Sequence, residues 1–366
     1  MSAVDLKESI YAVTLAELRE RLVAAGQPAY RAAQVLEWVY AKRVEGFEAM
    51  SNLPAALRAV LAEGFIFHAL EPVRVLGSED TTRKYLFRLG DGALVESVLI
   101  PASPALYGEA SDRRTLCVST QVGCAYGCKF CASGLDGWSR NLTPGEIVGQ
   151  ILRVEKLSGE RVSNLVFMGM GEPLANFKNL LIALEILNSP WGVGIGARRI
   201  TLSTSGLAPQ IRLLAEQSMQ VRLAVSLHGA RDEVRQQIMP VNRKYPLAEL
   251  LDACEYYMER KKQRITFEYI LIREVNDTLE DAAALVQVAQ RVDAKVNCIP
   301  YNLVDGLDWV RPEESRQDAF MAVLKRAKVS ATIRREKGHD ISAACGQLRR
   351  QTLAAADPSA GGASEV

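Results

Sequence analysis

Three cysteines lie close together in this chain, and their spacing has the clearest chemical meaning of any feature in the sequence. Cys124, Cys128 and Cys131 form a C-x3-C-x2-C run. Cysteine thiolates are soft ligands that bind iron–sulfur clusters, zinc or copper(I). A four-iron cluster takes one outer ligand on each iron, so three cysteines would leave one iron open to a ligand that is not protein. An open iron indicates chemistry on a bound molecule rather than electron storage.

Zinc is the alternative to an iron–sulfur cluster. Structural zinc sites favour paired C-x2-C units or added histidines. This chain has a single C-x2-C pair, and its histidines are scattered at His68, His228 and His339. The spacing therefore favours an iron–sulfur cluster, while a zinc ion with its fourth ligand elsewhere stays open.

The cysteine run, with Phe130 directly before its last cysteine, resembles the radical S-adenosylmethionine (SAM) superfamily. The resemblance implies that Cys124, Cys128 and Cys131 hold a [4Fe–4S] cluster and that the amino and carboxylate groups of SAM chelate the fourth iron. It also implies that one electron from the cluster cleaves SAM to methionine and a 5′-deoxyadenosyl radical. An electron donor such as flavodoxin or ferredoxin is then an expected partner.

Glycine and polar residues follow several of the expected buried strands. One such stretch is Met168-Gly169-Met170-Gly171-Glu172-Pro173. Taken alone, it would be a strand-to-helix turn, and single polar residues at strand ends are more often caps or turn formers. Beside the cysteine run it resembles the GEP motif of radical SAM enzymes, which implies that Gly171 and Glu172 hold the SAM amino group. The other expected SAM-pocket residues are Ser203, Ser226, Leu227, His228 and Asn302.

Two further cysteines stand out by their surroundings. Cys117 lies in the first expected core strand, and Cys345 lies among small residues directly before Gly346. A lone buried cysteine is usually a small hydrophobic residue, which is our interpretation of Cys254 and Cys298. Thiolate reactivity needs access and an electropositive neighbourhood, and the small neighbours of Cys345 would give access to its sulfur.

Several motifs in order resemble the RlmN/Cfr family of RNA adenine methyltransferases, and they are found at residues 117–124, 168–174, 202–206, 226–228 and 343–348. Members of this family methylate adenine ring carbons in 23S ribosomal RNA. The RlmN branch acts on C2 and also on some tRNAs, whereas the Cfr branch acts on C8. The resemblance implies 23S rRNA, and tRNA as well, as partners of this chain. It favours C2, and the motifs alone leave C8 open.

The resemblance also implies roles for three side chains and the use of two SAM molecules per turnover. Cys345 would take a methyl group from the first SAM, and the radical from the second would abstract hydrogen from that methyl group. The resulting methylene radical would add to adenine and tether the RNA to Cys345. Glu96 matches the family's proton acceptor, although its strand pattern alone would make it a solvent-facing residue. Cys117 would attack the Cys345 sulfur, form a transient disulfide and release the methylated base.

The chain from about Thr115 onward has the alternating pattern that could position these residues. Apolar runs are typical of buried parallel strands, and they occur at 116–119, 165–168, 200–203, 223–227, 265–271, 296–299 and 331–333. Helical segments lie between them, one opening with the capping box Thr143–Glu146 and others at 180–187, 209–217, 247–258 and 281–291. This pattern predicts an α/β fold, a complete or partial (β/α) barrel. Chemistry in such barrels occurs at the C-terminal ends of the strands, where the cysteine loop and the polar motifs fall.

The first hundred residues differ from the rest in pattern. Three short amphipathic helical segments precede three strand-like runs, and Asp91-Gly92 is a hairpin signal between two of these runs. We expect four parts: a helical RNA-binding domain over 1–70, a β meander and linker over 71–110, the radical SAM barrel over 111–350 and a disordered tail over 351–366.

Composition limits the class of protein. The chain is 48% hydrophobic and 24% charged, as in soluble globular proteins, and its net charge of +1 gives no global sign of nucleic-acid binding. The sequence lacks the ~20-residue apolar stretch of a membrane span, a signal peptide and the pattern of a disulfide framework. We therefore expect a cytoplasmic protein. The remote alternative from another class is a zinc-bearing RNA-binding module without catalysis.

Overall fold

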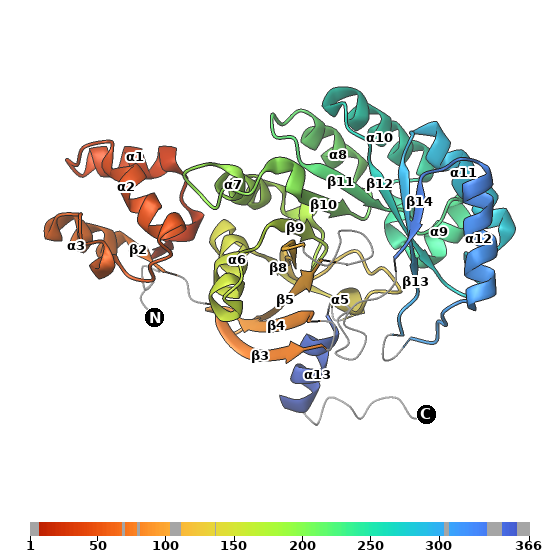
Figure 1. Ribbon diagram of the computed structural model, residues 1–366, viewed down its shortest axis with the longest axis horizontal. Coiled ribbons are helices and arrows are strands. Elements are labelled where there is room, and N and C mark those ends of the chain that lie inside the picture. Colours follow the sequence, from red (N-terminus) through yellow and green to blue (C-terminus); the bar gives the residue numbers. More distant parts are fainter. Residues whose placement is uncertain are drawn as a thin grey trace.

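The computed structural model describes residues 7–67, 70–78, 81–102, 111–135, 137–303, 307–334 and 346–356. Within these residues one sheet joins ten strands in the order β14-β13-β12-β11-β10-β9-β6-β5-β4-β3 (Figure 1). Strands β6 and β9 to β14 run parallel, whereas β3, β4 and β5 run antiparallel to their neighbours. The strands are β3 (Glu71–Gly77), β4 (Arg83–Arg88), β5 (Leu94–Pro101), β6 (Arg114–Cys117), β9 (Asn164–Phe167), β10 (Ile200–Thr204), β11 (Arg222–Ser226), β12 (Thr266–Leu271), β13 (Lys295–Pro300) and β14 (Ala331–Ile333).

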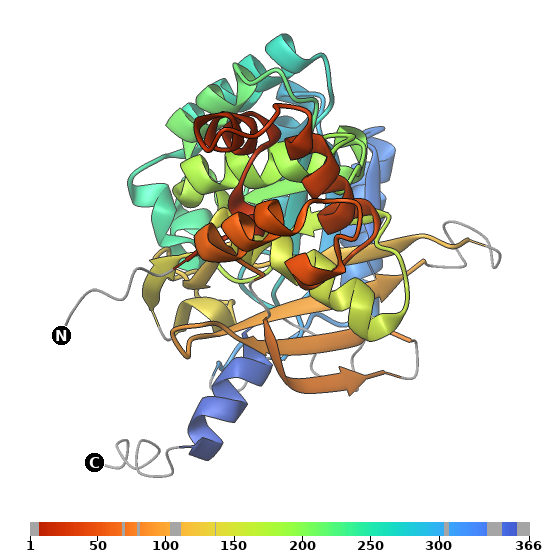
Figure 2. The ribbon, with the colours of Figure 1, turned by 90° about the vertical axis from the view of Figure 1, so that its left-hand side faces the viewer.

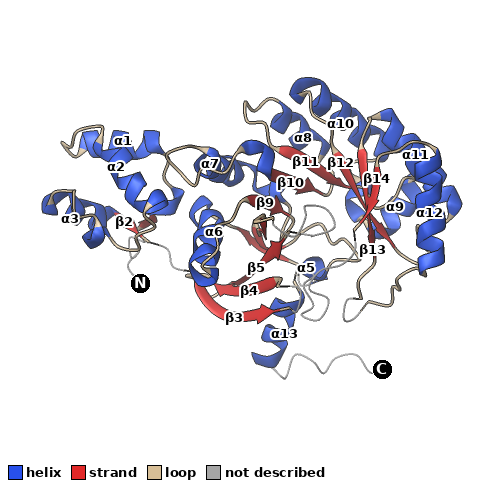
Figure 3. Cartoon of the chain, in the orientation of Figure 1, coloured by secondary structure: helices blue, strands red, loops and turns tan. Residues whose placement is uncertain are grey.

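Helices connect the parallel strands and cover the outer face of that half of the sheet (Figure 3). They are α6 (Pro144–Ser158), α7 (Phe177–Asn188), α8 (Ala208–Ala215), α9 (Asp232–Ile238), α10 (Leu247–Lys261), α11 (Leu279–Arg291) and α12 (Glu314–Arg326). The predicted partial (β/α) barrel is confirmed, and the capping box of Thr143 and Glu146 is present at the start of α6. Helices α9 and α12 were not among the predicted segments. None of the described helices is long and apolar enough to cross a membrane.

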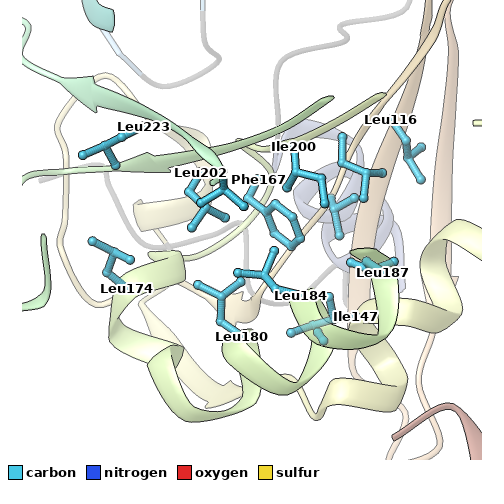
Figure 4. Packing of buried hydrophobic residues seen from close by; sticks show 14 of the residues in the cluster. Leu116, Ile147, Phe167, Leu174, Leu180, Leu184, Leu187, Ile200, Leu202 and Leu223 are labelled. Carbon is cyan, nitrogen blue, oxygen red and sulfur yellow. The ribbon is translucent and has the colours of Figure 1, made fainter. Parts of the chain in front are cut away.

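The main core lies between these helices and the sheet. Figure 4 shows helices α6 and α7 presenting aliphatic side chains to the strands. Alternate strand residues point to the same face, so every second residue of β9 and β10 enters this core. Full burial of such aliphatic and aromatic side chains stabilises the fold by about 1.5–3 kcal/mol each. The buried side chains here include Leu116, Ile147, Phe167, Leu180, Leu184, Ile200 and Leu202.

The N-terminal region forms a small helical unit at the side of the barrel (Figure 2). It contains β1 (Glu8–Ser9), α1 (Leu15–Ala24), α2 (Arg31–Leu36), a π-helical turn (Glu37–Ala41), α3 (Ala55–Gly64) and β2 (Phe65–Ile66). A cavity of about 530 Å³ lies where this unit meets α6. Arg43 reaches across this contact to Glu155 of α6 at 2.8 Å. The unit thus packs along α6, and Ser9 and Ala12 lie against Gly145 in the first turn of that helix.

The predicted meander is part of the barrel's own sheet, because β5 pairs antiparallel with β6. Helix α6 covers one of its faces: Ser97 on β5 donates to Gln150 of α6 at 2.9 Å. Helix α13 (Gln347–Ala356) covers the other face, where Leu348 packs with Leu86 and Leu94.

This helix corrects the prediction of a disordered tail from residue 351. The backbone is helical to Ala356, and residues 357–366 lie outside the described residues. The Ala- and Gly-rich composition was a poor guide to residues 351–356, because α13 is held through its first turn. Leu348 is buried there against the meander, and Glu96 binds two of its backbone amides.

Candidate active site

The three clustered cysteines lie on a loop at the C-terminal end of β6, between β7 (Gln121–Gly123) and α5 (Ala132–Leu135). Strand β7 pairs with β8 (Trp138–Asn141) and closes the loop at its base. The Cys124 amide donates to the carbonyl of Gly137 at 2.8 Å, and the Cys131 amide donates to the carbonyl of Cys128 at 3.0 Å. The predicted position at the C-terminal edge of the barrel is the one observed.

The thiols of this loop interact with one another and with an acidic side chain. Burial raises the pKa of Cys124 to about 12, and the nearby Cys131 and Glu172 raise it further. Burial likewise raises the pKa of Cys128 well above its usual range, with Cys131, Cys124 and Glu172 adding to the effect and Arg235 opposing it. Thiolates in such a place need a positive partner, and a bound metal centre supplies one.

No three His, Cys, Asp or Glu side chains within the described ranges gather as ligands of one metal ion. The thiolates of a four-iron cluster bind different irons and are therefore spread apart.

Glu172 is buried beside the cysteine loop, and its carboxylate is fixed by the backbone. Oε1 accepts from the amide of Leu174 at 3.0 Å, and Oε2 accepts from the amide of Ser205 at 2.6 Å. Burial raises the pKa of Glu172, and these two backbone hydrogen bonds oppose the rise. The neighbouring Gly171 has φ +96°, and a Cβ there would come within 2.5 Å of Gln121. Glycine is thus required at this position both by its backbone conformation and by close packing.

His228 is buried, and its ring lies next to the cysteine loop. The ring meets Phe130 edge-on, with the ring centroids 4.6 Å apart. Its Nδ1 accepts from the amide of Ile270 at 3.0 Å, which places the proton of the neutral imidazole on Nε2. Burial lowers the pKa of His228 to about 3, and the charge of Arg235 lowers it further. The side chain is therefore a neutral group of fixed orientation.

The other expected SAM-pocket residues lie at neighbouring strand ends. Ser203 and Ser226 are partly exposed on β10 and β11. The Leu227 side chain is fully buried in the core, so this residue could offer only its backbone to a ligand. In the described part of the chain the buried Oδ1 of Asn302 has no hydrogen-bond partner. An acceptor without a donor at a strand end is suited to a ligand that donates.

Arg235 on α9 is a site residue that sequence reasoning missed. It is fully buried, and it donates to the carbonyl of Leu227 at 3.1 Å and to the carbonyl of Ser205 at 2.6 Å. Burial lowers its pKa to about 10, and the nearby Cys128 opposes that shift. Arg235 thus joins the loops after β10 and β11 and brings a positive charge near the cysteines. An arginine within a short polar helix gives no sequence signal for this role.

Glu96, expected to face solvent by its strand pattern and expected to be catalytic by resemblance, is buried. Its Oε2 lies 3.0 Å from Lys84 Nζ and accepts from the Gly346 amide at 2.8 Å, while Oε1 accepts from the Arg349 amide at 2.6 Å. The carboxylate therefore caps the N-terminus of α13. The solvent-facing interpretation is wrong because α13 covers this face of the meander. Lys84 is a second residue that sequence reasoning missed.

Cys117 lies on the same face of the sheet as Glu96. Residues opposite each other on paired strands share a face, and Val98 lies opposite Cys117 on β6 and opposite Lys84 on β4. Glu96 is two residues before Val98, so it shares that face as well. Cys117 is buried there, 6% exposed.

The first turn of α13 links this face to the cysteine loop. Gly346 has φ +90°, and a Cβ on it would meet the Ser133 backbone at 2.6 Å. Ser133 lies on α5, the short helix that begins directly after Cys131. The residue after Cys345 in the sequence therefore lies between Glu96 and the end of the cysteine loop. Cys345 itself lies outside the described residues.

Comparison with known proteins first defines the class. Residues 118–286 match the Radical SAM superfamily, and residues 9–66 match the ribosomal RNA large subunit methyltransferase N-terminal domain. A crystal structure of a radical SAM methyltransferase from Sphaerobacter thermophilus is 44% identical, with a TM-score of 0.86 over 93% of this chain and 98% of that chain. The protein is a radical SAM enzyme.

Curated relatives then define the family. A probable dual-specificity RNA methyltransferase RlmN from Akkermansia muciniphila is 58% identical over 91% of this chain and 94% of its own length. A probable dual-specificity RNA methyltransferase RlmN 3 from Opitutus terrae is 50% identical over 97% of this chain and all of its own length. The chain belongs to the RlmN family.

Membership of this class makes a [4Fe–4S] cluster and SAM the cofactors, and the site fits both. Three mutually interacting thiols on one loop are the donor set of a cluster with one open iron. The buried Glu172 carboxylate follows β9 close to the loop cysteines. Asn302 follows β13, and among the described residues its Oδ1 has no partner. Both are acceptors, which suits the ammonium and hydroxyl donors of SAM.

Proposed function

We propose that this chain methylates C2 of an adenine in 23S rRNA, and in tRNA, with Cys345 as the methyl carrier and Cys117 as the thiol that releases the product. The observation that carries the proposal is the position of Gly346, which donates to Glu96 and packs against Ser133. Because Cys345 is its neighbour in the sequence, this position supports a carrier that meets both the cluster site and the proton acceptor. The RlmN name of the relatives supports C2 over C8.

The cofactor-binding residues have separate tasks in this scheme. When bound, the cluster and SAM supply a methyl group and a 5′-deoxyadenosyl radical. Cys124, Cys128 and Cys131 hold the cluster. An ionised carboxylate offers about four acceptor sites, and backbone amides take two of those on Glu172. The remaining sites would accept the SAM ammonium, with the carboxylate already oriented.

Glu96 would accept the proton that the adenine ring carbon loses, and its surroundings indicate which carboxylate oxygen takes it. Three donors surround its carboxylate in the described residues: Lys84 and Gly346 at Oε2, and Arg349 at Oε1. Since a carboxylate has about two acceptor sites on each oxygen, the remaining site is on Oε1. The proton would move to that oxygen, and Lys84 would keep the side chain in place.

Cys117 would act after methyl transfer to the base. Its sulfur would attack the sulfur of Cys345, so that an S–S bond forms while the bond between the Cys345 sulfur and the transferred carbon breaks. The carbon would leave with the bonding electron pair and take up one proton, equal to the one that the Cys117 thiol gives up, to become the methyl group. Its place on the face that Glu96 shares supports this role. Burial keeps other thiols away from Cys117 until the two cysteines meet.

The remaining partners belong to the same proposal. The helical unit of residues 1–70 would hold folded RNA, which proteins recognise mainly by shape and by splayed-out bases. A one-electron donor such as flavodoxin or ferredoxin would reduce the cluster, and the protein would act in the cytoplasm.

Mass spectrometry of a Cys117→Ala protein expressed in cells tests the scheme. The variant should accumulate a covalent adduct of RNA on Cys345 that survives denaturation and shrinks to one nucleotide on nuclease digestion. A Cys254→Ala protein is the control, because Cys254 is a buried core residue of α10. Unmodified Cys117→Ala protein with full product formation would remove Cys117 from the mechanism. Nucleoside analysis of the RNA distinguishes 2-methyladenosine from 8-methyladenosine.

A further inference from the structure

The inner face of the parallel half of the sheet is partly exposed on some strands and buried on others. On β11 and β12 the inner residues Ala224, Glu268 and Ile270 are buried. On β9, β10 and β13 the residues that face the helices are fully buried, whereas the alternate residues are partly exposed. Tyr269 of β12 shows which side is outer, because its ring packs against Phe320 of α12 with centroids 5.5 Å apart. Glu268 is the next residue on β12 and therefore points to the inner face.

Polar side chains form a row across this inner face. In the parallel register Ser226 of β11 lies opposite Glu268, Glu268 lies opposite Asn297 of β13, and Asn297 lies opposite Thr332 of β14. Neighbouring strands are about 4.8 Å apart, so the row crosses four strands at one level. Its residues range from Glu268, which is 7% exposed, through partly exposed Asn297 to exposed Thr332. The row leads from solvent at the β14 edge into the barrel.

Hydrogen bonds along the row fix its donors and acceptors. Asn297 Nδ2 donates to Glu268 Oε2 at 2.7 Å, and Asn297 Oδ1 accepts from Thr332 Oγ1 at 3.2 Å. Because a carboxylate is an acceptor only, the Asn297 amide must turn its nitrogen toward Glu268. Nδ2 has a second hydrogen for a further acceptor. Within the described residues Glu268 accepts this one side-chain hydrogen bond, and Oε1 is available to a further donor.

Burying the ionised Glu268 carboxylate lowers the stability of the folded protein unless a binding partner compensates for its lost hydration. Burial raises the pKa of Glu268, with the Arg334 charge and the Asn297 hydrogen bond opposing the rise. Burying an ionised group without full compensation costs several kcal/mol. Perturbed carboxylates in open concave places are frequent at functional sites. Glu268, Asn297 and Thr332 have no role in the cluster binding, SAM ammonium binding or proton transfer assigned above.

We propose that Glu268 and Asn297 bind the N6–N7 edge of the target adenine and thereby determine base specificity. Glu268 Oε1 would accept from the exocyclic amino group, and Asn297 Nδ2 would donate to N7. An acceptor beside a donor matches this edge, and asparagine commonly reads adenine at N6 and N7. A ribose hydroxyl both donates and accepts, so the test below measures SAM binding to tell the two ligands apart. The inference rests on the proposed function, because it assigns the residues that recognise its substrate.

The edge of the purine ring that Glu268 and Asn297 bind determines which ring carbon is exposed for methylation. N6 and N7 lie on one side of adenine, whereas C2 lies between N1 and N3 on the opposite side. A base held by its N6–N7 edge therefore turns C2 away from the row. C8 is bonded to N7 and would lie against Asn297. The same contact would thus select adenine and expose C2 rather than C8.

Base analogues in the target RNA test this assignment. A synthetic 23S rRNA fragment would carry adenosine, purine riboside (which lacks the amino group) or 7-deazaadenosine (which lacks N7) at the target position. The unmodified enzyme should prefer adenosine over purine riboside by about 10- to 100-fold, as expected for a hydrogen bond to a charged group. It should prefer adenosine over 7-deazaadenosine by about 2- to 10-fold, as expected for a hydrogen bond between neutral groups. Glu268→Gln should bring the purine riboside ratio close to one. Asn297→Ala should do the same for 7-deazaadenosine.

The controls separate base recognition from other roles. Thr201→Ala, a change on the same inner face but outside the row, should keep both ratios. Iron content and 5′-deoxyadenosine formation should stay normal in Glu268→Gln. Unchanged ratios in both row variants would overturn the inference, as would weakened SAM binding in Glu268→Gln, which would assign that residue to SAM. If Glu268→Gln does not fold, Asn297→Ala decides the question. An unmodified enzyme that methylates no RNA would instead refute the proposed function.

Discussion

The parallel strands β9–β14 and the antiparallel strands β4 and β5 belong to one sheet, yet they expose different faces. The parallel half has helices on its outer side, and its inner side is partly exposed on β9, β10 and β13. Strands β4 and β5 of the meander are covered by α6 and by α13, and all but their ends are buried. Open and covered regions therefore meet at β6, the strand that precedes the cysteine loop.

This difference matches the chemistry assigned to each region. Ligands that enter and leave need access, and the acceptors that we propose for SAM and for the target base belong to the parallel half. Lys84 and Glu96 lie in the covered region at 0% and 1% exposure. A buried ion pair adds little to stability compared with an apolar pair, so its presence is better explained by the position it gives Glu96. Cys117, on β6, lies on the boundary.

Loss of a cluster ligand should have the largest effect and should be confined to the open region. Cys128→Ala should abolish cluster assembly and SAM cleavage, because a thiolate ligand to one iron is removed. Iron and sulfide content and 5′-deoxyadenosine formation are the measurements. Cys298→Ala is the matched control, since Cys298 is a fully buried core residue of β13. A Cys128→Ala protein with full iron content and activity would contradict the assignment.

Loss of the buried lysine should have a smaller effect, on stability. Lys84→Met leaves the Glu96 carboxylate buried without its charged partner, which should lower the free energy of unfolding by about 3–5 kcal/mol. Anaerobic urea unfolding would measure this change. Arg88→Met is the control on the same strand: its pair with Glu71 at 3.3 Å is exposed, so the cost should be below about 1 kcal/mol.

A double variant sharpens this test of the covered region. Lys84→Met with Glu96→Gln should be more stable than Lys84→Met alone, because no unpaired charge remains. Equal losses for Lys84→Met and Arg88→Met would show that water reaches the Lys84–Glu96 pair. The covered and open regions would then not differ in the way described above.

The sequence predicted the strands of the barrel better than the contacts of the meander, for a physical reason. Parallel strands buried against helices are continuous apolar runs, and β14 has the predicted bounds while β10 extends the predicted strand by one residue. The loop of Cys124 and the GEP motif around Glu172 were found because their spacing is local. Residues that are close together in the chain form a motif that can be recognised without knowledge of the fold.

Contacts between distant segments could not be predicted in this way. Glu96 was expected from its pattern to face solvent, and only the position of α13, 250 residues later in the chain, buries it. Lys84 and Arg235 are charged residues with no motif around them, and their roles depend on which strands and loops lie beside them. The row of Glu268, Asn297 and Thr332 likewise exists only through the register of β12, β13 and β14.

The smallest expected effect is on the pH dependence of stability. It concerns His228 and tests whether water is excluded from this side chain. Its pKa in the folded protein is lowered to about 3, whereas an unfolded histidine titrates near 6.5. Below pH ~6.5 the unfolded state therefore binds a proton that the folded state does not, and stability falls as the pH falls. From pH ~7.5 to ~5.5 this amounts to about 1.4 kcal/mol.

His228→Asn should lack this part of the pH dependence. Asparagine tolerates the positive φ of 54° at this position, and its Oδ1 could accept from the Ile270 amide as Nδ1 does. Anaerobic urea unfolding at several pH values would give the stability difference between the two proteins. All other titrating groups, His68 and His339 included, are common to both and cancel in that difference. The unmodified protein should lose about 1.4 kcal/mol more than the variant on acidification. Parallel pH profiles would mean that water reaches His228 and that the ring titrates normally, so the open inner face would extend to the cysteine loop.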